Sequence, residues 1–199
     1  MQTLPILEIP ILLASQSPRR SQLLLEVGFN VQVVEANYEE IVDPNLDVHL
    51  VAEKLAVEKA NAYQGILDSH QVLCTADTIV LTGDLQILGK PKDILDAKAM
   101  LRKLSGTQHK VITGVCLRSG DKLISFSDTA IVTLTSMSDI EIDYYIDKFM
   151  PLDKAGAYGI QEWIGHCKIS AINGSYLTIM GLPVHLIYEN LGLHFLKRI

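Results

Sequence analysis

The sequence predicts a mixed α/β protein, in which antiparallel hairpins interrupt an otherwise regular alternation of strands and helices. Three observations lead to this prediction. Short apolar runs next to glycine, proline or acidic residues indicate strands, as at 11–14, 31–34 and 72–76. Longer segments with apolar residues at helical spacing indicate helices. Two long apolar stretches separated by Ser-Gly-Asp-Lys at 119–122 indicate an antiparallel hairpin.

The first half of the chain is expected to contain two helices. The first begins at Pro18, which suits the first helical position, and ends at Gly28. The second follows a turn at Asp43-Pro44-Asn45 and runs from Asp47 to about Tyr63.

The second half is expected to contain three further helices and several strands. A turn at Gly83-Asp84 is followed by a helix over 93–104 and by the hairpin strands at 110–118 and 123–134. Ser138 and Glu141 form a capping-box signature for a helix that reaches about Lys148. A tightly turned or mobile segment at 151–161, two strands within 169–179 and a closing helix after Gly181 complete the expected order.

Composition limits the class of protein. The chain has 199 residues, of which 48% are hydrophobic, so a single domain over 1–199 with a sizeable core is expected. A net charge of −6 makes broad binding of DNA or RNA unfavourable, although it permits a local basic pocket. No apolar run reaches membrane-spanning length, and the three widely spaced cysteines suit a reducing compartment, so we expect no membrane contact and a cytoplasmic location.

The stretch Ser-Gln-Ser-Pro-Arg-Arg at 15–20 links the first strand to the first helix. Ser17 suits the N-cap, and the helix start presents backbone amides and the positive end of the helix dipole. Arg19 and Arg20 add planar cations shaped for phosphate or carboxylate oxygens. The stretch therefore indicates a polyanion site, and the alternative is a capped helix with two solvated arginines.

Lys59 lies on the apolar stripe of the expected helix over 47–63, four residues after Leu55. A lysine at such a position either extends past the edge of the core to solvent or points into a pocket with an anionic partner. The sequence leaves both alternatives open.

Asp77 is the strongest single candidate for chemistry. It follows the strand at 72–76 and precedes a second apolar run at 79–81, so it lies between two buried strands. A carboxylate there must be paired, bound to a metal or located at a cleft mouth.

Together with Glu40, Asp77 could supply oxygen ligands to Mg²⁺, while Arg19, Arg20, Lys59 and Lys90 could neutralise the charge of a leaving phosphate. The alternative is that Glu39-Glu40 is a solvated loop and that Asp77 is a buried hydrogen-bonding residue. Known phosphate loops are absent, because Pro91 occupies the position that a P-loop gives to serine or threonine. The adjacent His166 and Cys167 favour a structural role over a metal site.

Seven segments in this order resemble the Maf-like nucleoside triphosphate pyrophosphatases, and together they cover nearly the whole chain. They are Leu-Ala-Ser-Gln-Ser-Pro-Arg-Arg at 13–20, Ala-Asp-Thr-Ile-Val at 76–80, Gly-Lys-Pro at 89–91, Met-Leu-Arg-Lys-Leu-Ser-Gly at 100–106 with His109, Asp-Lys-Ala-Gly-Ala-Tyr-Gly-Ile-Gln at 153–161, Ile-Asn-Gly-Ser-Tyr at 172–176 and Met-Gly-Leu-Pro at 180–183.

The resemblance implies hydrolysis of a nucleoside triphosphate between the α and β phosphates, with a divalent cation such as Mg²⁺ or Mn²⁺. It implies that Asp77 is the catalytic proton acceptor and that Asp77 and Glu40 hold the metal. The family's usual Asp-Glu pair appears here as Glu39-Glu40. The substrate-binding residues that it implies are Ser15, Arg19, Arg20, Lys59, Thr78, Lys90 and Gln161.

Arg20, Thr78 and Gln161 occupy the positions that separate the branches of the family, and this set resembles the branch that acts on dTTP and UTP. The expected role is removal of unwanted nucleotides, including modified pyrimidines. A side-chain amide such as that of Gln161 can both donate and accept a hydrogen bond, which matches the adjacent carbonyl and N–H groups of uracil or thymine.

The resemblance also implies an elongated mixed sheet flanked by helices, two lobes with a central cleft as in inosine triphosphate pyrophosphatases, and homodimers. A second hypothesis is a nucleotide-binding regulator of septum formation without significant turnover. The intact Asp77 argues against a purely binding role.

Overall fold

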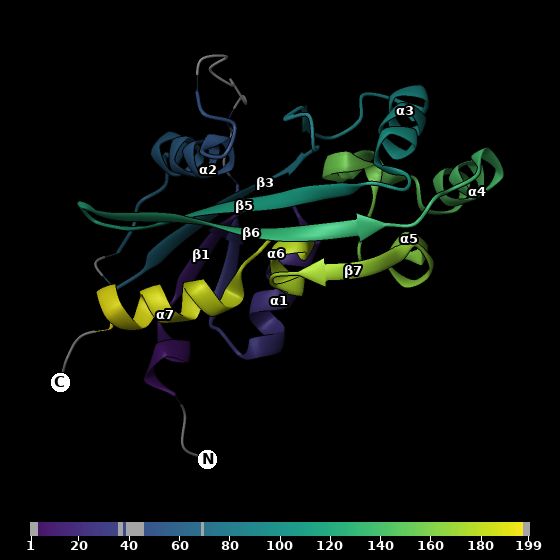
Figure 1. The fold of residues 1–199 in the computed structure, drawn as a ribbon. Coiled ribbons are helices and arrows are strands. Elements are labelled where there is room, and N and C mark those ends of the chain that lie inside the picture. The colour runs from purple at the N-terminus through teal and green to yellow at the C-terminus, as the bar shows by residue number, and fades with distance from the viewer. Residues whose placement is uncertain (1–3, 36–37, 39–45, 69, 197–199) are drawn as a thin grey trace. The chain divides into compact units, whose positions relative to one another are not determined.

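The structure is a computed structural model that describes residues 4–35, 38, 46–68 and 70–196 (Figure 1). The expected turn at 43–45 and Glu40 lie outside these residues. The chain divides into two compact units. The first comprises 1–77, 113–128 and 181–199, and the second comprises 78–112 and 129–180.

The described residues form a mixed sheet of seven strands, which confirms the predicted α/β class. Six strands follow the order β2-β1-β3-β5-β6-β7, and β4 pairs with β3. β1 pairs in parallel with both β2 and β3, whereas β3–β4 and β6–β7 are antiparallel. The strands are β1 (Ile11–Ala14), β2 (Val31–Val34), β3 (Val72–Leu81), β4 (Ile87–Leu88), β5 (Gln108–Ser119), β6 (Lys122–Leu134) and β7 (Ile169–Asn173).

The five predicted helices occur in the predicted order, and two short helices that were not predicted, over 163–167 and 176–180, lie between the last two of them. The α-helices are α1 (Pro18–Val27), α2 (Val51–Ala62), α3 (Ile94–Leu104), α4 (Asp139–Phe149), α5 (Trp163–Cys167), α6 (Tyr176–Met180) and α7 (Val184–His194). Three short 3-10 helices lie at η1 (Pro5–Glu8), η2 (Pro151–Asp153) and η3 (Ala155–Ala157). No helix among the described residues is long and apolar enough to cross a membrane.

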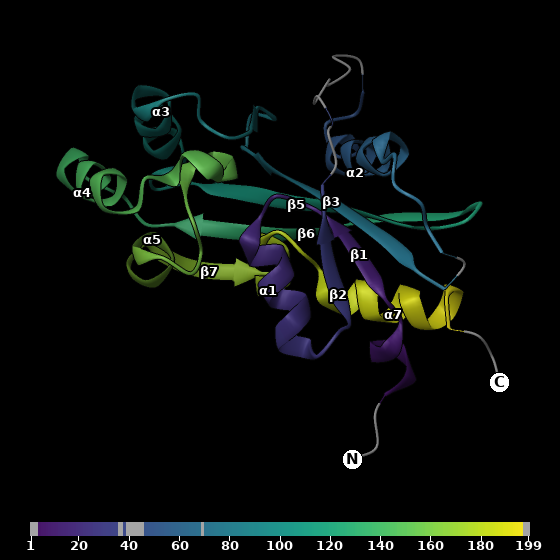
Figure 2. The ribbon, with the colours of Figure 1, turned by 180° about the vertical axis from the view of Figure 1, so that it is seen from behind.

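In the first unit, β1 is fully buried between β2 and β3 (Figure 2). One core cluster joins the apolar residues of β1 and β3 to Ala56 and Ala60 of α2 and to Cys116 of β5. Small residues on α2 allow the helix backbone to approach the sheet closely. A Cβ added at Gly114 of β5 would lie only 2.3 Å from the carbonyl carbon of Ala52, so glycine is needed at this contact.

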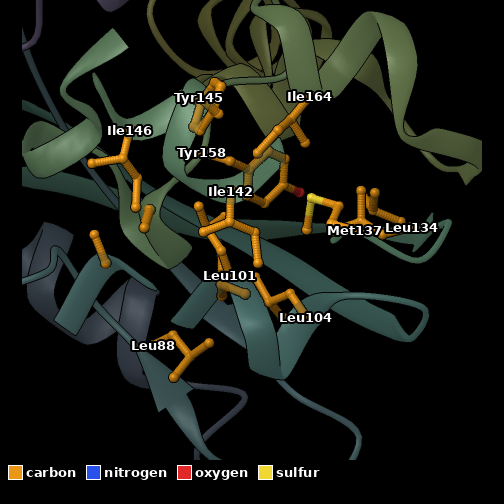
Figure 3. Close-up of a cluster of buried hydrophobic side chains, with 14 of the residues drawn as sticks. Leu88, Leu101, Leu104, Leu134, Met137, Ile142, Tyr145, Ile146, Tyr158 and Ile164 are labelled. Carbon is orange, nitrogen blue, oxygen red and sulfur yellow. The ribbon is translucent and has the colours of Figure 1, made fainter. Parts of the chain in front are cut away.

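The second unit has its own core, drawn in Figure 3. Side chains of α3 and α4, such as Leu101 and Ile142, pack there with Tyr145, Tyr158 and Ile164. The predicted capping box begins α4: the Ser138 hydroxyl accepts a hydrogen bond from the Glu141 amide, and the Glu141 carboxylate accepts one from the Ser138 amide.

Three local predictions were wrong. The runs at 72–76 and 79–81 are one continuous strand, β3, so Asp77 lies within a strand rather than at its end. The segment 176–180 is the helix α6 rather than a second strand, because a short apolar run does not by itself distinguish the two structures. α2 begins at Val51, four residues after the predicted start. Of the two alternatives for 151–161, the tightly turned one is confirmed, by η2 and η3.

Candidate active site

The turn between β1 and α1 begins the candidate site in the first unit. Ser17 is the N-cap, as predicted, but its side chain makes no capping hydrogen bond to the helix. Its backbone amide donates instead to the Ser15 hydroxyl, at 3.2 Å. Gly28 ends the helix with a left-handed φ of 95°, the conformation in which glycine is favoured.

Arg20 joins this turn to two distant parts of the first unit. Its Nε donates to the Gly181 carbonyl at 2.8 Å, and its Nη1 donates to the Ala76 carbonyl at 2.8 Å and to the Ser15 hydroxyl at 3.2 Å. Ala76 immediately precedes Asp77. The guanidinium therefore fixes the backbone of β3 next to the candidate catalytic carboxylate, a contact that sequence reasoning missed.

Lys59 and Asp77 form an ion pair in the first unit. The Lys59 ammonium nitrogen lies 2.5 Å from Asp77 Oδ1, and the two side chains are only 16% and 11% exposed. Of the two alternatives for Lys59, the anionic partner is the one the structure contains. The contact gives the Asp77 carboxylate a charged hydrogen-bond donor in a largely buried position.

The position of α2 on β3 creates this ion pair. The Thr75 hydroxyl on β3 donates to the Ala56 carbonyl on α2 at 2.6 Å, and both residues are fully buried. Arg118 of β5 donates to the Ala60 carbonyl at 2.8 Å. These bonds hold the helix segment on either side of Lys59 against the sheet.

The predicted site residues divide between the two units. Ser15, Arg19, Arg20, Lys59 and Asp77 belong to the first unit, and Thr78, Lys90 and Gln161 belong to the second. The division falls between Asp77 and Thr78, within β3. The structure therefore brings Ser15, Arg20, Lys59 and Asp77 together, while Lys90 is exposed and Gln161 half-buried in the second unit.

A divalent cation is compatible with the chemistry of Asp77. Among the described residues, no group of three histidine, cysteine or acidic side chains could hold a metal ion by itself. Mg²⁺ commonly uses one or two carboxylates together with substrate phosphates and water, rather than a full set of protein ligands. Asp77, a slightly exposed carboxylate, fits that donor pattern.

Sequence reasoning also missed the contacts around Gln161. The hydroxyl of Tyr145 donates to the Glu162 carboxylate and accepts a hydrogen bond from the Gly159 amide at 2.9 Å. Lys154 lies 3.1 Å from the same carboxylate. Lys154 and Glu162 lie close to Gln161 in the sequence, but no sequence pattern indicated that either is near Tyr145.

A mixed α/β fold, a helix start with two arginines and an ion-paired carboxylate are together typical of a protein that binds a phosphate-bearing ligand. The profile of the Maf-like protein family matches residues 10–193. The chain therefore belongs to the Maf-like family.

Two relatives illustrate the similarity. The chain is 46% identical to a protein of Parabacteroides distasonis named dTTP/UTP pyrophosphatase, with 93% of this chain and 95% of the relative covered. It is 42% identical to a protein of the same name from Flavobacterium johnsoniae, with 91% and 93% covered. Among solved structures, the Ham1 protein of Staphylococcus aureus aligns with 63% of this chain and 71% of its own, at a TM-score of 0.45 and 13% identity.

Proposed function

We propose that this protein is a nucleoside triphosphate pyrophosphatase that hydrolyses dTTP and UTP, and modified pyrimidine nucleotides with the same base edge. Water would add across the bond between the α and β phosphates to give the monophosphate and pyrophosphate. The relatives' names support the substrate class. The observation that supports the proposed reaction is the ion pair between Lys59 and Asp77. This pair lies next to the start of α1, because Arg20 of α1 donates a hydrogen bond to the carbonyl of Ala76, the residue before Asp77.

Asp77 is proposed as the general base. Its carboxylate would take a proton from the attacking water, whose oxygen then bonds to the α phosphorus as the bond to the β-phosphate oxygen breaks. Lys59 holds Asp77 Oδ1 at 2.5 Å, which orients the carboxylate before substrate arrives. An oriented base needs less rearrangement to reach the transition state.

Cations are proposed to stabilise the departing pyrophosphate. Arg19 and the amides at the start of α1 would bind phosphate oxygens, with Ser15, Lys59 and Lys90 as further contacts. Arg20 is proposed both to contact substrate and to hold the Ala76 backbone. Thr78 and Gln161 are proposed to select the base.

A divalent cation, Mg²⁺ or Mn²⁺, completes the proposal. Asp77 would hold it together with Glu40, and it would add positive charge at the triphosphate and acidify bound water. The resemblance to the family further supports a homodimer, and the cysteine content supports a cytoplasmic location.

Release of pyrophosphate from the common ribo- and deoxyribonucleotides, with and without Mg²⁺, tests this function. We expect turnover of UTP and dTTP that requires the cation. In water enriched in oxygen-18, the label should enter UMP, because attack occurs at the α phosphorus. Label in pyrophosphate would contradict the mechanism, and absence of release from every nucleotide would favour a nucleotide-binding regulator of septum formation.

A further inference from the structure

Three side chains of the second unit, Tyr145, Glu162 and Lys154, meet beside the segment that carries Gln161. We call this group the Tyr145 clamp. The Glu162 carboxylate accepts a hydrogen bond from the Tyr145 hydroxyl at Oε2, and its Oε1 lies 3.1 Å from the Lys154 ammonium. Each carboxylate oxygen therefore has its own donor. Lys154 also pairs with Asp153, at 2.7 Å.

The clamp is buried. Tyr145 is completely inaccessible and belongs to the core cluster drawn in Figure 3, and the side chains of Lys154 and Glu162 are 9% and 16% exposed. Buried ionic and hydroxyl groups are costly unless every one is paired, so breaking one contact affects the others. Such a group favours a single arrangement of the chain around it.

The clamp fixes the backbone on both sides of Gln161. The Tyr145 hydroxyl accepts from the Gly159 amide at 2.9 Å, and the Glu162 amide donates to the Gly159 carbonyl at 3.1 Å. A Cβ added at Gly159 would lie 2.9 Å from Glu162 Oε2, so a larger residue there would displace the carboxylate from its present position. Ile160 is buried, whereas Gln161 is half-buried.

The same segment also holds the chain next to Lys90. The Gly156 amide donates to the Gly89 carbonyl at 3.0 Å. Gly156 has a left-handed φ of 68°, and a Cβ there would lie 2.9 Å from Val80, so the close approach also depends on glycine. One anchored segment thus borders two of the proposed substrate-binding residues, Lys90 and Gln161.

We propose that the Tyr145 clamp positions Gln161 for recognition of the pyrimidine base, so that Tyr145, Glu162 and Lys154 determine specificity without contacting the nucleotide. This inference rests on the proposed function, in which Gln161 reads the base. A side chain that discriminates hydrogen-bonding edges must be held closely, because a small displacement exchanges good hydrogen bonds for poor ones.

The substitution Tyr145→Phe tests the clamp, because it removes one hydroxyl and keeps the ring. The measured quantity is preference, the ratio of kcat/KM for UTP to that for CTP, whose base presents a different edge. We expect the preference to fall about tenfold, mainly through a higher KM for UTP, with kcat changed less than threefold. The matched control is Tyr144→Phe, which removes the neighbouring, exposed hydroxyl that binds Lys148 and should leave the preference unchanged.

A second pair of variants covers the case in which Tyr145→Phe folds poorly. Glu162→Gln retains an oxygen acceptor for the Tyr145 hydroxyl, whereas Glu162→Ala retains none. We expect the glutamine variant to keep most of the preference and the alanine variant to lose it. Equal preference in both variants and the wild type would overturn the proposal.

Binding of the non-hydrolysable α,β-methylene analogues of UTP and CTP separates this proposal from the proposed function. If the wild-type protein prefers the UTP analogue but releases no pyrophosphate, the proposed activity is refuted. The clamp is still supported in that case if Tyr145→Phe lowers the preference for the UTP analogue. Unchanged preference in Tyr145→Phe, by turnover or by binding, would overturn the clamp even if UTP turnover is confirmed.

Discussion

Lys59 on α2 contacts Asp77 in the middle of β3, with 2.5 Å between the ammonium nitrogen and Oδ1. Both side chains are largely buried, so solvent screens the pair less than it would at the surface. The contact explains how a carboxylate is accommodated within a strand whose other residues are almost all buried and apolar.

Replacing Lys59 with methionine should reduce turnover of UTP. Methionine fills a similar volume but removes the ammonium that contacts Asp77 Oδ1, so we expect kcat/KM for UTP to fall about 10- to 100-fold, the range for losing a charge-assisted hydrogen bond. Steady-state pyrophosphate release measures this. The control Lys54→Met removes an exposed lysine of the same helix, 3.6 Å from Glu58, and should change kcat/KM less than twofold. Equal effects of the two substitutions would contradict a special role for Lys59.

Arg20→Lys should destabilise the first unit. A single ammonium cannot span the Gly181 and Ala76 carbonyls as the planar guanidinium does, so we expect a loss of about 2 kcal/mol in the free energy of unfolding. Urea denaturation provides the measurement. Arg102→Lys, which alters an exposed pair with Asp139, should lower the free energy of unfolding much less. A loss no larger for Arg20→Lys than for Arg102→Lys would show that the two carbonyl contacts are dispensable.

Gly114→Ala should displace α2 from the sheet. The added Cβ would lie 2.3 Å from backbone atoms of both Ala52 and Glu53, which cannot move independently of the helix. We expect a loss of about 3 kcal/mol or more, together with reduced turnover, because α2 carries Lys59. Gly83→Ala is the control: the nearest atom to its Cβ is 4.0 Å away, and the cost should stay below about 1 kcal/mol. Thermal and urea unfolding measure the stability of both variants. A Gly114→Ala variant as stable as the wild type would contradict the close packing of α2 on β5.

His109 should make stability depend on pH. It is 2% exposed, its Nε2 lies 2.7 Å from the Tyr158 hydroxyl, and burial lowers its pKa to about 4. The unfolded chain, with a histidine pKa near 6.5, binds a proton that the folded protein does not. Above about pH 6.5 neither state binds this proton, so the free energy of unfolding has its full value there. As the pH falls from about 6.5 to about 4, the free energy of unfolding decreases by on the order of 3 kcal/mol.

Urea unfolding of the wild type and His109→Gln at pH 7.5 and 4.5 isolates this effect. The variant should lose less stability on acidification than the wild type does, whereas His166→Gln, at an exposed position, should match the wild type. Identical pH dependence in all three proteins would exclude the buried histidine as the cause.

Local signals explain what the sequence predicted well. Pro18 and Gly28 mark the two ends of α1, and Ser138 with Glu141 begins α4, because caps depend on residues close in sequence. The helical spacing of apolar residues likewise identified α3, whose start lies one residue after the predicted one.

Contacts between distant residues were not predictable. Lys59 and Asp77 are 18 residues apart, and Arg20 and Gly181 are 161 apart. Their contacts depend on how α2 and α1 pack on the sheet, which no local pattern encodes. β3 runs continuously through Asp77, whose carboxylate is paired with Lys59. The roles of the site residues stay predictions, supported by the geometry around Asp77 and by the resemblance to the family.

Asp77→Asn is the most direct test of the central claim that Asp77 acts as the base for hydrolysis of UTP. Asparagine keeps the shape and an oxygen near Lys59 but cannot accept the proton from water. With UTP and Mg²⁺, pyrophosphate release should fall about a thousandfold or more, while the melting temperature stays within a few degrees of the wild type. A folded Asp77→Asn protein that retains near wild-type release would contradict the account.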